Sequence, residues 1–203
     1  MKKDVQEFQE IYDTYQPRIL SYLARMVGPD EAEDLTQDVF LKVIQALPGF
    51  RGQSSLSTWI YRIATNAAWD RLRRPAGQRT AASGPREDAD AGADAEDALM
   101  GEAAPSAEQQ LIRVEMRGCI MEFVEKLPEN YRTVIVLSEL EDLRNSEIAE
   151  ILGVTLDTVK IRLHRARARL KEELRGHCDF FRDERNEIAC DRKREDPKPA
   201  LTD

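Results

Sequence analysis

The chain has 203 residues and a formal net charge of −8, because 38 Asp or Glu outnumber 30 Lys or Arg. Its 41% hydrophobic and 6% aromatic content is enough for a modest core in one or two small domains. No segment approaches the ~18 consecutive apolar residues of a membrane span, and the first residues lack the apolar stretch of a signal peptide. Three cysteines are too few for a secreted disulfide framework. We therefore expect a cytoplasmic protein without membrane insertion.

Helical periodicity covers the first part of the chain. Apolar residues recur at helix spacing over residues 5–27, and Gly28 and Pro29 then interrupt the pattern. A second helix is predicted to begin near Asp30, and a third near Ser57, whose hydroxyl can cap it. Strand-like alternation is not found over any length, so the expected elements are helices joined by loops.

The composition changes between residues 75 and 105. Gly, Pro, Ala and acidic residues dominate there, and the apolar periodicity vanishes. Such a segment cannot bury enough apolar surface to offset the entropy cost of ordering it. Its like charges repel one another, which favours an extended chain. We therefore predict a flexible acidic linker at residues 76–106, between two small helical domains.

Two helices joined by a tight turn follow in the second domain. Gly153 suits the left-handed conformation that ends the first helix, and Thr155 can cap the second. Asp157 lies in the first turn of the second helix, where its charge suits the positive end of the helix dipole. One apolar stripe of that helix is predicted to be buried: Val159, Leu163, Ala166, Leu170 and Leu174.

This last helix is strongly basic although the whole protein is acidic. Its cations lie off the apolar stripe, and the first two turns after Val159 hold no acidic residue to pair with them. A tight turn followed by a basic helix is typical of a DNA-binding helix-turn-helix, whose second helix enters the major groove. Arg and Lys can contact guanine edges or phosphates there. The alternative is a solvated charged face, stabilised by charge pairs along the helix.

Segments of the N-terminal half point beyond a simple helix-turn-helix. Three stretches follow one another in order, with the acidic linker before the last: AEDLTQDVF, FRGQSSLSTWIYRIATN and GVTLDTVKIRLHRARARL. Together they resemble the sigma factors of bacterial RNA polymerase, specifically the small extracytoplasmic-function type. The resemblance covers nearly all of residues 5–175. It implies an all-α fold with two small helical domains and the helix-turn-helix in the second.

The resemblance also implies a domain plan and a function. Residues 1–75 would form sigma region 2, which binds core RNA polymerase and the minus-ten promoter element. Residues 107–175 would form region 4, which binds the minus-thirty-five element, and residues 176–203 a cysteine-containing tail. The protein would recognise promoter DNA and assist its melting, without catalytic activity. An anti-sigma factor is implied as a further partner, since one commonly covers the polymerase-binding surfaces in this family.

The family's contacts transfer to individual residues of this sequence. The acidic helix that docks on the largest polymerase subunit supplies Glu33, Asp34, Gln37, Asp38 and Phe40. The loop and helix that face the minus-ten element supply Arg51, Gln53, Ser54, Ser55, Arg62, Asn66 and Arg73. The recognition helix for the minus-thirty-five element supplies Thr158, Lys160, Arg162, His164, Arg165, Arg167 and Arg169.

Two positions depart from the family pattern. Ile161 stands where relatives often have Ser or Thr, which removes one expected phosphate or base contact. Arg144 stands where a Ser cap is common, so we expect Asn145 to cap that helix one residue later. The acidic helix also has an alternative interpretation, as an ordinary amphipathic helix whose acids only serve solubility.

The C-terminal tail holds chemistry that the resemblance does not explain. A hairpin would bring Cys178 and Cys190, with His177 nearby, together as a switchable disulfide or part of a zinc site. Against zinc, eleven residues separate the two thiols, whereas zinc ligands often follow C-x2-4-C spacing. The alternative is a plain docking tail. Cys119, on an apolar helix, is expected to be a buried small residue, and no other cofactor is expected.

Two other functions stay open from the sequence. One is a stand-alone helix-turn-helix regulator that does not bind core polymerase, and the other is a protein that sequesters a partner without binding DNA. Co-purification with core polymerase would exclude the first, and failure to bind DNA even with polymerase present would favour the second. An enzyme is disfavoured, because the sequence has no phosphate-loop or zinc-protease motif and only two histidines.

Overall fold

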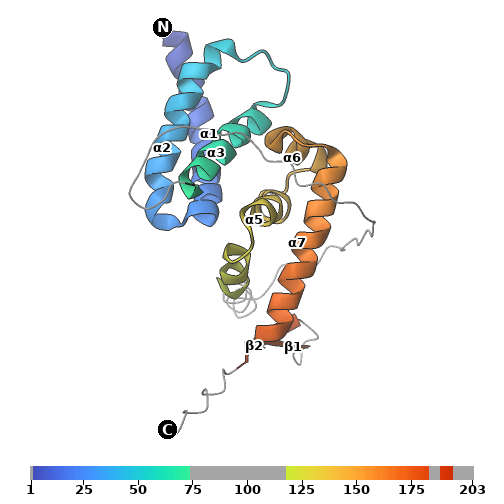
Figure 1. Ribbon diagram of the computed structural model, residues 1–203. Coiled ribbons are helices and arrows are strands. Elements are labelled where there is room, and N and C mark those ends of the chain that lie inside the picture. Colours follow the sequence, from blue (N-terminus) through green and yellow to red (C-terminus); the bar gives the residue numbers. More distant parts are fainter. Residues whose placement is uncertain (1, 74–117, 183–187, 194–203) are drawn as a thin grey trace.

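The computed structural model describes residues 2–73, 118–182 and 188–193, and the statements below refer to these residues (Figure 1). The predicted acidic linker at residues 76–106 lies outside them, as do the domain boundaries predicted on either side of it. Within the described residues, no helix combines the length and the apolarity that a membrane crossing requires.

The N-terminal module, residues 2–73, is built from helices that pack around one core. Its elements are α1 (Lys2–Val27), α2 (Pro29–Ala46), the short 3-10 helix η1 (Leu47–Gly49) and α3 (Leu56–Leu72). α1 and α2 lie side by side, joined at Gly28, whose φ of 92° is a conformation that favours glycine. Pro29 then opens α2, where its missing N–H has no helical partner to lose. The three long helices all contribute to the core: Ile19, Tyr22, Leu23, Met26, Val39, Val43, Ile60 and Ala64.

The C-terminal module, residues 118–193, contains the predicted helix pair. Residues 118–125 are helical, and the next helix begins after Pro128. The elements that follow are α5 (Glu129–Ile135), the π-helical turn η2 (Val136–Leu140), α6 (Asn145–Leu152) and α7 (Leu156–His177). α7 packs along α5 and α6. Their shared core includes Val134, Leu137, Ile148, Ile151 and Leu163.

A β-hairpin follows α7, which is an addition to the predicted all-α class. β1 (Cys178–Arg182) and β2 (Ile188–Arg192) pair antiparallel, with Phe180 opposite Cys190. Each strand has only five residues, and β1 buries only Cys178, so the sequence carries little strand pattern. The other regular elements of the described chain are helical, which confirms the predicted class apart from this hairpin.

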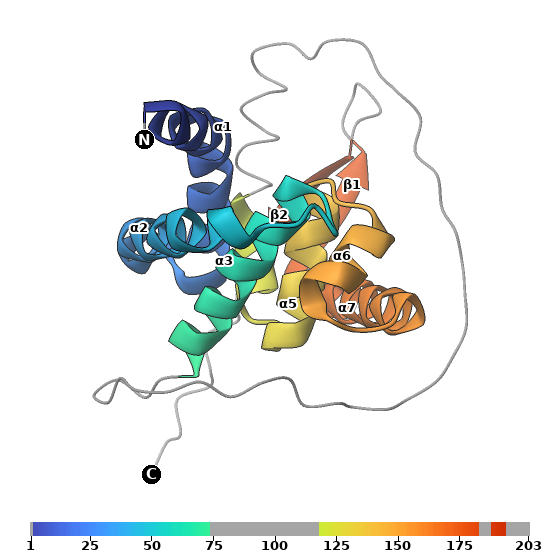
Figure 2. The ribbon, with the colours of Figure 1, turned by 90° about the horizontal axis from the view of Figure 1, so that it is seen from above.

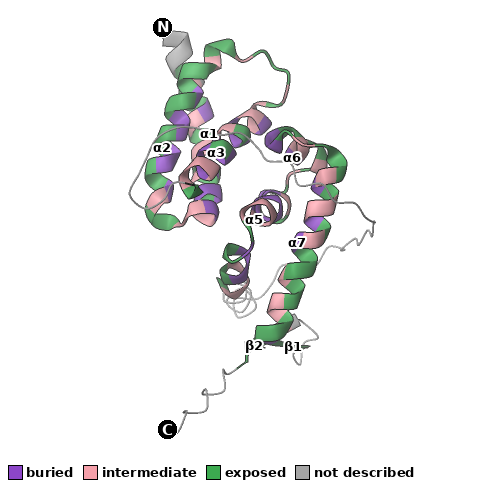
Figure 3. Cartoon of the chain, viewed as in Figure 1, coloured by how far each residue is buried: buried purple, intermediate pink, exposed green. Residues whose placement is uncertain are grey.

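The two modules pack against each other. α3 lies between the α1–α2 pair and α6 (Figure 2), and one continuous cluster of buried apolar residues crosses the boundary. Figure 3 shows buried residues where the modules face each other and exposed residues along the outer side of α7. α3 therefore belongs to the core of its own module and to the interface between modules at the same time.

Candidate nucleic-acid interface

The turn between α6 and α7 has the conformation that the sequence predicts. Gly153 ends α6 with φ 65° and ψ 32°. This is the left-handed region of backbone conformation, which residues other than glycine rarely adopt. Thr155 caps α7, because its hydroxyl accepts a hydrogen bond from the Thr158 backbone N–H at 3.2 Å. Asp157 lies in the first turn of α7, as expected. Local chemistry at the turn therefore defines where each helix of the pair begins or ends.

The start of α6 differs from the prediction. Arg144 is the N-cap residue, so Asn145 is the first helical residue rather than the cap. The capping side chain belongs to the first turn of α6: the Glu147 carboxylate accepts a hydrogen bond from the Arg144 backbone N–H at 3.0 Å. The Arg144 guanidinium also donates to Glu147 at 3.2 Å. Both hydrogen bonds hold the pKa of the Glu147 carboxyl below its usual range, and the bond from the guanidinium has the larger effect.

α7 buries one side and carries its cations on the others. Val159, Leu163 and Ala166 are buried, as predicted, and Leu170 and Leu174 are half-buried along the same stripe. The basic residues flank this stripe in two rows, because a helix completes one turn in 3.6 residues. The first row is Lys160, His164, Arg167 and Lys171, and the second row is Arg162, Arg165 and Arg169.

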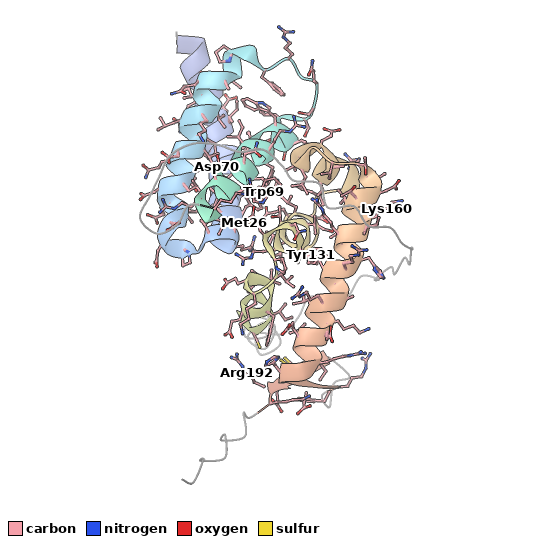
Figure 4. All side chains as sticks on the ribbon, viewed as in Figure 1. Met26, Trp69, Asp70, Tyr131, Lys160 and Arg192 are labelled. Carbon is pink, nitrogen blue, oxygen red and sulfur yellow. The ribbon has the colours of Figure 1, made fainter. Side chains whose placement is uncertain are left out.

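The first row is the more open of the two. Lys160, His164 and Arg167 are all exposed, and Figure 4 shows Lys160 on the outer side of α7, away from the core. Arg167 also contacts Glu139 of η2, with Nη2 2.7 Å from Oε1. These two side chains are 57% and 45% exposed, so solvent screens their attraction and the pair holds Arg167 only weakly.

The second row and the helix start are less open. Arg162 and Arg165 are half-buried, and Arg169 is exposed. Thr158, predicted as a DNA contact, is half-buried, and its hydroxyl lies 2.8 Å from the capping hydroxyl. Sequence reasoning missed Leu156, the first residue of α7, which is 43% exposed. An apolar residue at a helix start resembles a core residue in the sequence, and only the structure shows that Leu156 faces solvent.

The loop before α3 presents polar groups beside an aromatic pair. Phe50 packs on Trp59 of α3, with ring centroids 5.0 Å apart. Arg51 and Gln53 are exposed in this loop, and Ser54 is half-buried. Three of the residues predicted to contact the minus-ten element therefore lie together next to aromatic rings on which a base can stack.

Ser55, also predicted as a DNA contact, is the N-cap of α3. Its hydroxyl accepts a hydrogen bond from the Thr58 backbone N–H at 3.0 Å and lies 2.7 Å from the Thr58 hydroxyl. α3 therefore begins at Leu56, and the prediction that Ser57 caps this helix is wrong. Ser55 is exposed, but its hydroxyl is already engaged in holding the first turn of α3.

The other residues predicted to contact the minus-ten element lie along α3 and at its end. Asn66 is exposed. Arg62 donates from Nε to the backbone carbonyl of Glu150 on α6 at 2.9 Å, and Arg73 pairs with Glu129 of α5 at 3.5 Å. Two of the predicted cations are therefore engaged with the C-terminal module in this structure.

The outer face of α2 is acidic, with an apolar edge that sequence reasoning missed. The predicted polar contacts are all exposed: Glu33, Asp34, Gln37 and Asp38. Phe40 differs from the prediction, because it is only 2% exposed and packs edge-on against Tyr12, with centroids 4.9 Å apart. Leu41 and Ile44 supply apolar surface instead, with 58% and 43% of their area exposed. The helical period does carry this signal, because Phe40 falls on the buried stripe of α2 and Leu41 falls off it.

The three cysteines gather where the hairpin meets the helix at residues 118–125. Cys178 is buried, and Cys119 is half-buried rather than buried as expected. Cys190 is half-buried on β2, and burial raises the pKa of both hairpin thiols. His177 is exposed at the end of α7. Within the described chain, no group of three or more His, Cys, Asp or Glu is arranged to hold a metal ion, and the zinc interpretation stays a prediction.

Comparison with protein families finds matches in both modules. The family model of Sigma-70 region 2 matches residues 11–78, and that of Sigma-70, region 4 matches residues 117–170. The first match covers most of α1 together with α2 and α3. The second covers α5, α6 and most of α7, including the turn at Gly153.

Curated relatives are similar over most of the chain. The ECF RNA polymerase sigma factor SigW of Bacillus subtilis (strain 168) is 35% identical over 180 residues, which is 86% of this chain and 92% of the relative. The ECF RNA polymerase sigma-E factor of Escherichia coli (strain K12) is 35% identical over 173 residues, which is 82% of this chain and 85% of the relative.

Two solved structures have a similar fold. CnrH, in complex with the cytosolic domain of CnrY, is 23% identical with a TM-score of 0.57, and the match covers 84% of this chain and 89% of CnrH. The sigma factor RpoE from Bartonella quintana, in complex with the anti-sigma factor NepR, is 21% identical with a TM-score of 0.58. That match covers 84% of this chain and 98% of RpoE. At these identities the likeness concerns the fold alone.

Proposed function

This chain belongs to the extracytoplasmic-function (ECF) sigma factors of RNA polymerase, and we propose that its two modules divide promoter recognition between them. The chain is a promoter-recognising initiation factor. The N-terminal module binds core polymerase and the minus-ten element, and the C-terminal module binds the minus-thirty-five element. The observation that carries this assignment is the α6–α7 pair, in which a capped turn presents a basic helix with one buried stripe.

In the C-terminal module, α7 enters the major groove of duplex DNA. Lys160 and His164 support this proposal, because they are exposed on the N-terminal half of α7, the part that contacts base edges in helix-turn-helix proteins. A cation there can bind guanine edges or phosphates. Leu156 and Ile161 add apolar surface next to the cations, which fits the methyl group of thymine.

In the N-terminal module, the loop before α3 holds unpaired DNA of the minus-ten element. Arg51 and Gln53 offer a cation and an amide, and Trp59 offers an aromatic ring beside them. Asn66 contacts a base further along α3. Capture of the unpaired strand assists melting, because a ligand that binds one of two states shifts the equilibrium toward that state.

The outer face of α2 binds core RNA polymerase. Its carboxylates attract a basic partner surface and fix the register of the complex, and Leu41 and Ile44 supply apolar contact area. The proposal includes an anti-sigma factor as a further partner, because RpoE from Bartonella quintana, which has a similar fold, forms a complex with one. The factor acts by binding alone, without a catalytic step, and it works in the cytoplasm.

Run-off transcription with purified core RNA polymerase tests this function. Native chain plus core enzyme is expected to give discrete transcripts from a promoter library, and core enzyme alone none. Asp38→Lys reverses a charge on the proposed polymerase face and should weaken co-purification with core enzyme. Asp191→Lys makes the same reversal at an exposed position of the hairpin and should leave co-purification unchanged. A native chain that binds promoter DNA but neither co-purifies with core enzyme nor directs transcription would favour the stand-alone regulator.

A further inference from the structure

An acidic residue stands at the head of the first row of cations on α7. Asp157 precedes Lys160 by three residues and His164 by seven, so the three side chains share one face of a helix with 3.6 residues per turn. All three are exposed. They lie in the N-terminal half of α7, the part of a recognition helix that contacts base edges. A negative charge therefore belongs to the surface that is proposed to meet DNA.

The carboxylate of Asp157 is available to a partner outside the chain. Within the part of the chain that the structure describes, it accepts no hydrogen bond and forms no ion pair. The cap of α7 does not use it, because the Thr155 hydroxyl accepts the hydrogen bond from the Thr158 backbone N–H. Lys160 has no ion-pair partner among the described residues either, so the two charges stand side by side without closing on each other.

Helix stability explains only part of this placement. An acid in the first turn is favoured by the positive end of the helix dipole, and Asp157 satisfies that rule. The same charge opposes approach to DNA, because the duplex carries one negative charge for about every 1.7 Å of its axis. A carboxylate in the groove is therefore repelled unless a base edge offers it a hydrogen-bond donor.

The hydrogen-bonding groups of the major groove make cytosine the best partner for a carboxylate. An ionised carboxylate accepts hydrogen bonds and donates none. Cytosine presents its N4 amino donor, whereas guanine and thymine present acceptors. Adenine presents an N6 donor, but its N7 acceptor lies next to that donor and repels a carboxylate. Cytosine is thus the base that offers a donor without an acceptor beside it.

We propose that Asp157 selects a cytosine in the minus-thirty-five element, an inference that rests on the proposed function and identifies one base that α7 reads. The carboxylate accepts a hydrogen bond from cytosine N4, and any other base at that position leaves the charge unpaired beside the phosphates. Cations that contact phosphates raise the affinity for every sequence, whereas this acid raises the discrimination between sequences. Affinity and selectivity therefore come from different residues of the same helix face.

Two substitutions of Asp157 should give different signatures. An Asn side chain binds adenine through N6 and N7 together, so Asp157→Asn should change the preferred base from cytosine to adenine. Asp157→Ala removes the contact and should leave that position without a preferred base. Both variants lack a charge that phosphates repel, so both should bind duplex of random sequence about 3-fold more tightly than the native chain.

Glu172→Gln is the matched control for the loss of charge. Glu172 is exposed on the same helix, about four turns further toward its C-terminus than Asp157. The substitution therefore removes one negative charge from α7 outside the half that enters the groove. It should leave the preferred base unchanged.

The experiment uses holoenzyme reconstituted from core RNA polymerase and each full-length chain. The minus-thirty-five segment of a promoter found in the run-off assay is randomised, and the duplexes that each holoenzyme binds are sequenced. Native holoenzyme should enrich cytosine at one position, and replacement of that cytosine should weaken its binding about 10-fold. Asp157→Asn should enrich adenine at the same position, and Glu172→Gln should still enrich cytosine. An Asp157→Asn holoenzyme with the native preference overturns the inference.

Further measurements separate this inference from folding and from the proposed function. A role limited to the helix dipole would lower the melting temperature of Asp157→Asn and leave its preferred base unchanged. Circular dichroism checks that each variant is folded. If the Asp157 variants are not folded, native holoenzyme decides, because equal binding after replacement of every cytosine in the segment overturns the inference. A native chain that never directs transcription defeats the proposed function, whereas an active holoenzyme whose base preference ignores Asp157 defeats only this inference.

Discussion

α3 and α7 are both proposed to contact DNA, yet the protein holds them in opposite ways. Each begins at a hydroxyl cap, Ser55 for α3 and Thr155 for α7. α3 is buried by its own module on one side and by α6 on the other, whereas α7 buries one stripe. A helix with one buried stripe can hold its cations ready for DNA. A helix that also forms an interface shares cations with it: Arg62 and Arg73 contact the C-terminal module at its edge while they stay exposed to solvent.

Truncation of an apolar side chain should give the largest difference in stability between the two helices. Ile60 of α3 is fully buried, so Ile60→Ala should lower the free energy of unfolding by about 2–5 kcal/mol, through lost burial and the cavity left behind. Leu170→Ala, at a half-buried position of α7, should cost less than about 2 kcal/mol, because less apolar area is returned to water. Urea titration measures both values, and equal losses would contradict the contrast between the helices.

The first row of cations on α7 should give the next largest effect. Lys160→Ala should weaken binding to duplex carrying the minus-thirty-five element about 10-fold and reduce the slope of log K against log salt by about one. Lys171→Ala, in the same row but further along α7, should change both less, because the N-terminal half enters the groove. Fluorescence anisotropy at several salt concentrations measures both quantities. A larger loss for Lys171→Ala would mean that α7 docks in another orientation.

The two caps should contribute similar and smaller amounts, despite the different surroundings of their helices. Ser55→Ala and Thr155→Ala should each lower the free energy of unfolding by about 1 kcal/mol, because each leaves a first-turn N–H without its acceptor. Ser57→Ala, within the first turn of α3, is the matched control and should cost less than about 0.5 kcal/mol. Thermal unfolding compares the three variants, and a control that loses as much as Ser55→Ala would refute the cap assignment.

The smallest expected effect on stability comes from the Glu147 cap of α6, and it should depend on pH. The folded-state pKa of Glu147 lies below its ordinary value of 4.5, so the ionised carboxylate stabilises the protein above that value. This contribution is lost as the pH falls through the folded-state pKa. Glu147→Gln should therefore lower the melting temperature at neutral pH and approach the native value in acid. Glu172→Gln, at an exposed site on α7, should follow the native pH profile. A constant gap between native and Glu147→Gln at every pH would contradict this origin.

Features with local causes were predictable from the sequence. The turn at Gly153 and the cap at Thr155 follow from residue type, and the structure confirms both. The stripe of α7 follows from the helical period, and the structure buries its first three residues and half-buries the last two. The exposed carboxylates of α2 follow from the same reasoning. In each case the deciding interaction lies within a few residues of the side chain concerned.

Features with distant causes were not predictable in this way. Glu141 has no periodic signal, and its hydrogen-bond partners Arg25 and Tyr61 lie 116 and 80 residues away in the sequence. The sequence allows a hairpin in the tail as one possibility, and the structure has one; its register depends on pairing between two short strands, neither of which is stable alone.

The number of residues in the π-helical turn η2 determines where the Glu141 side chain points. The Glu141 N–H donates to the Val136 carbonyl at 3.1 Å, a five-residue step that accommodates one more residue than an ordinary helical turn. Deletion of one residue there would restore regular winding and rotate Glu141 by about 100° around the helix axis, away from Arg25 and Tyr61. A one-codon deletion at this turn would therefore break the contacts of Glu141 with α1 and α3 without altering any side chain proposed to contact DNA.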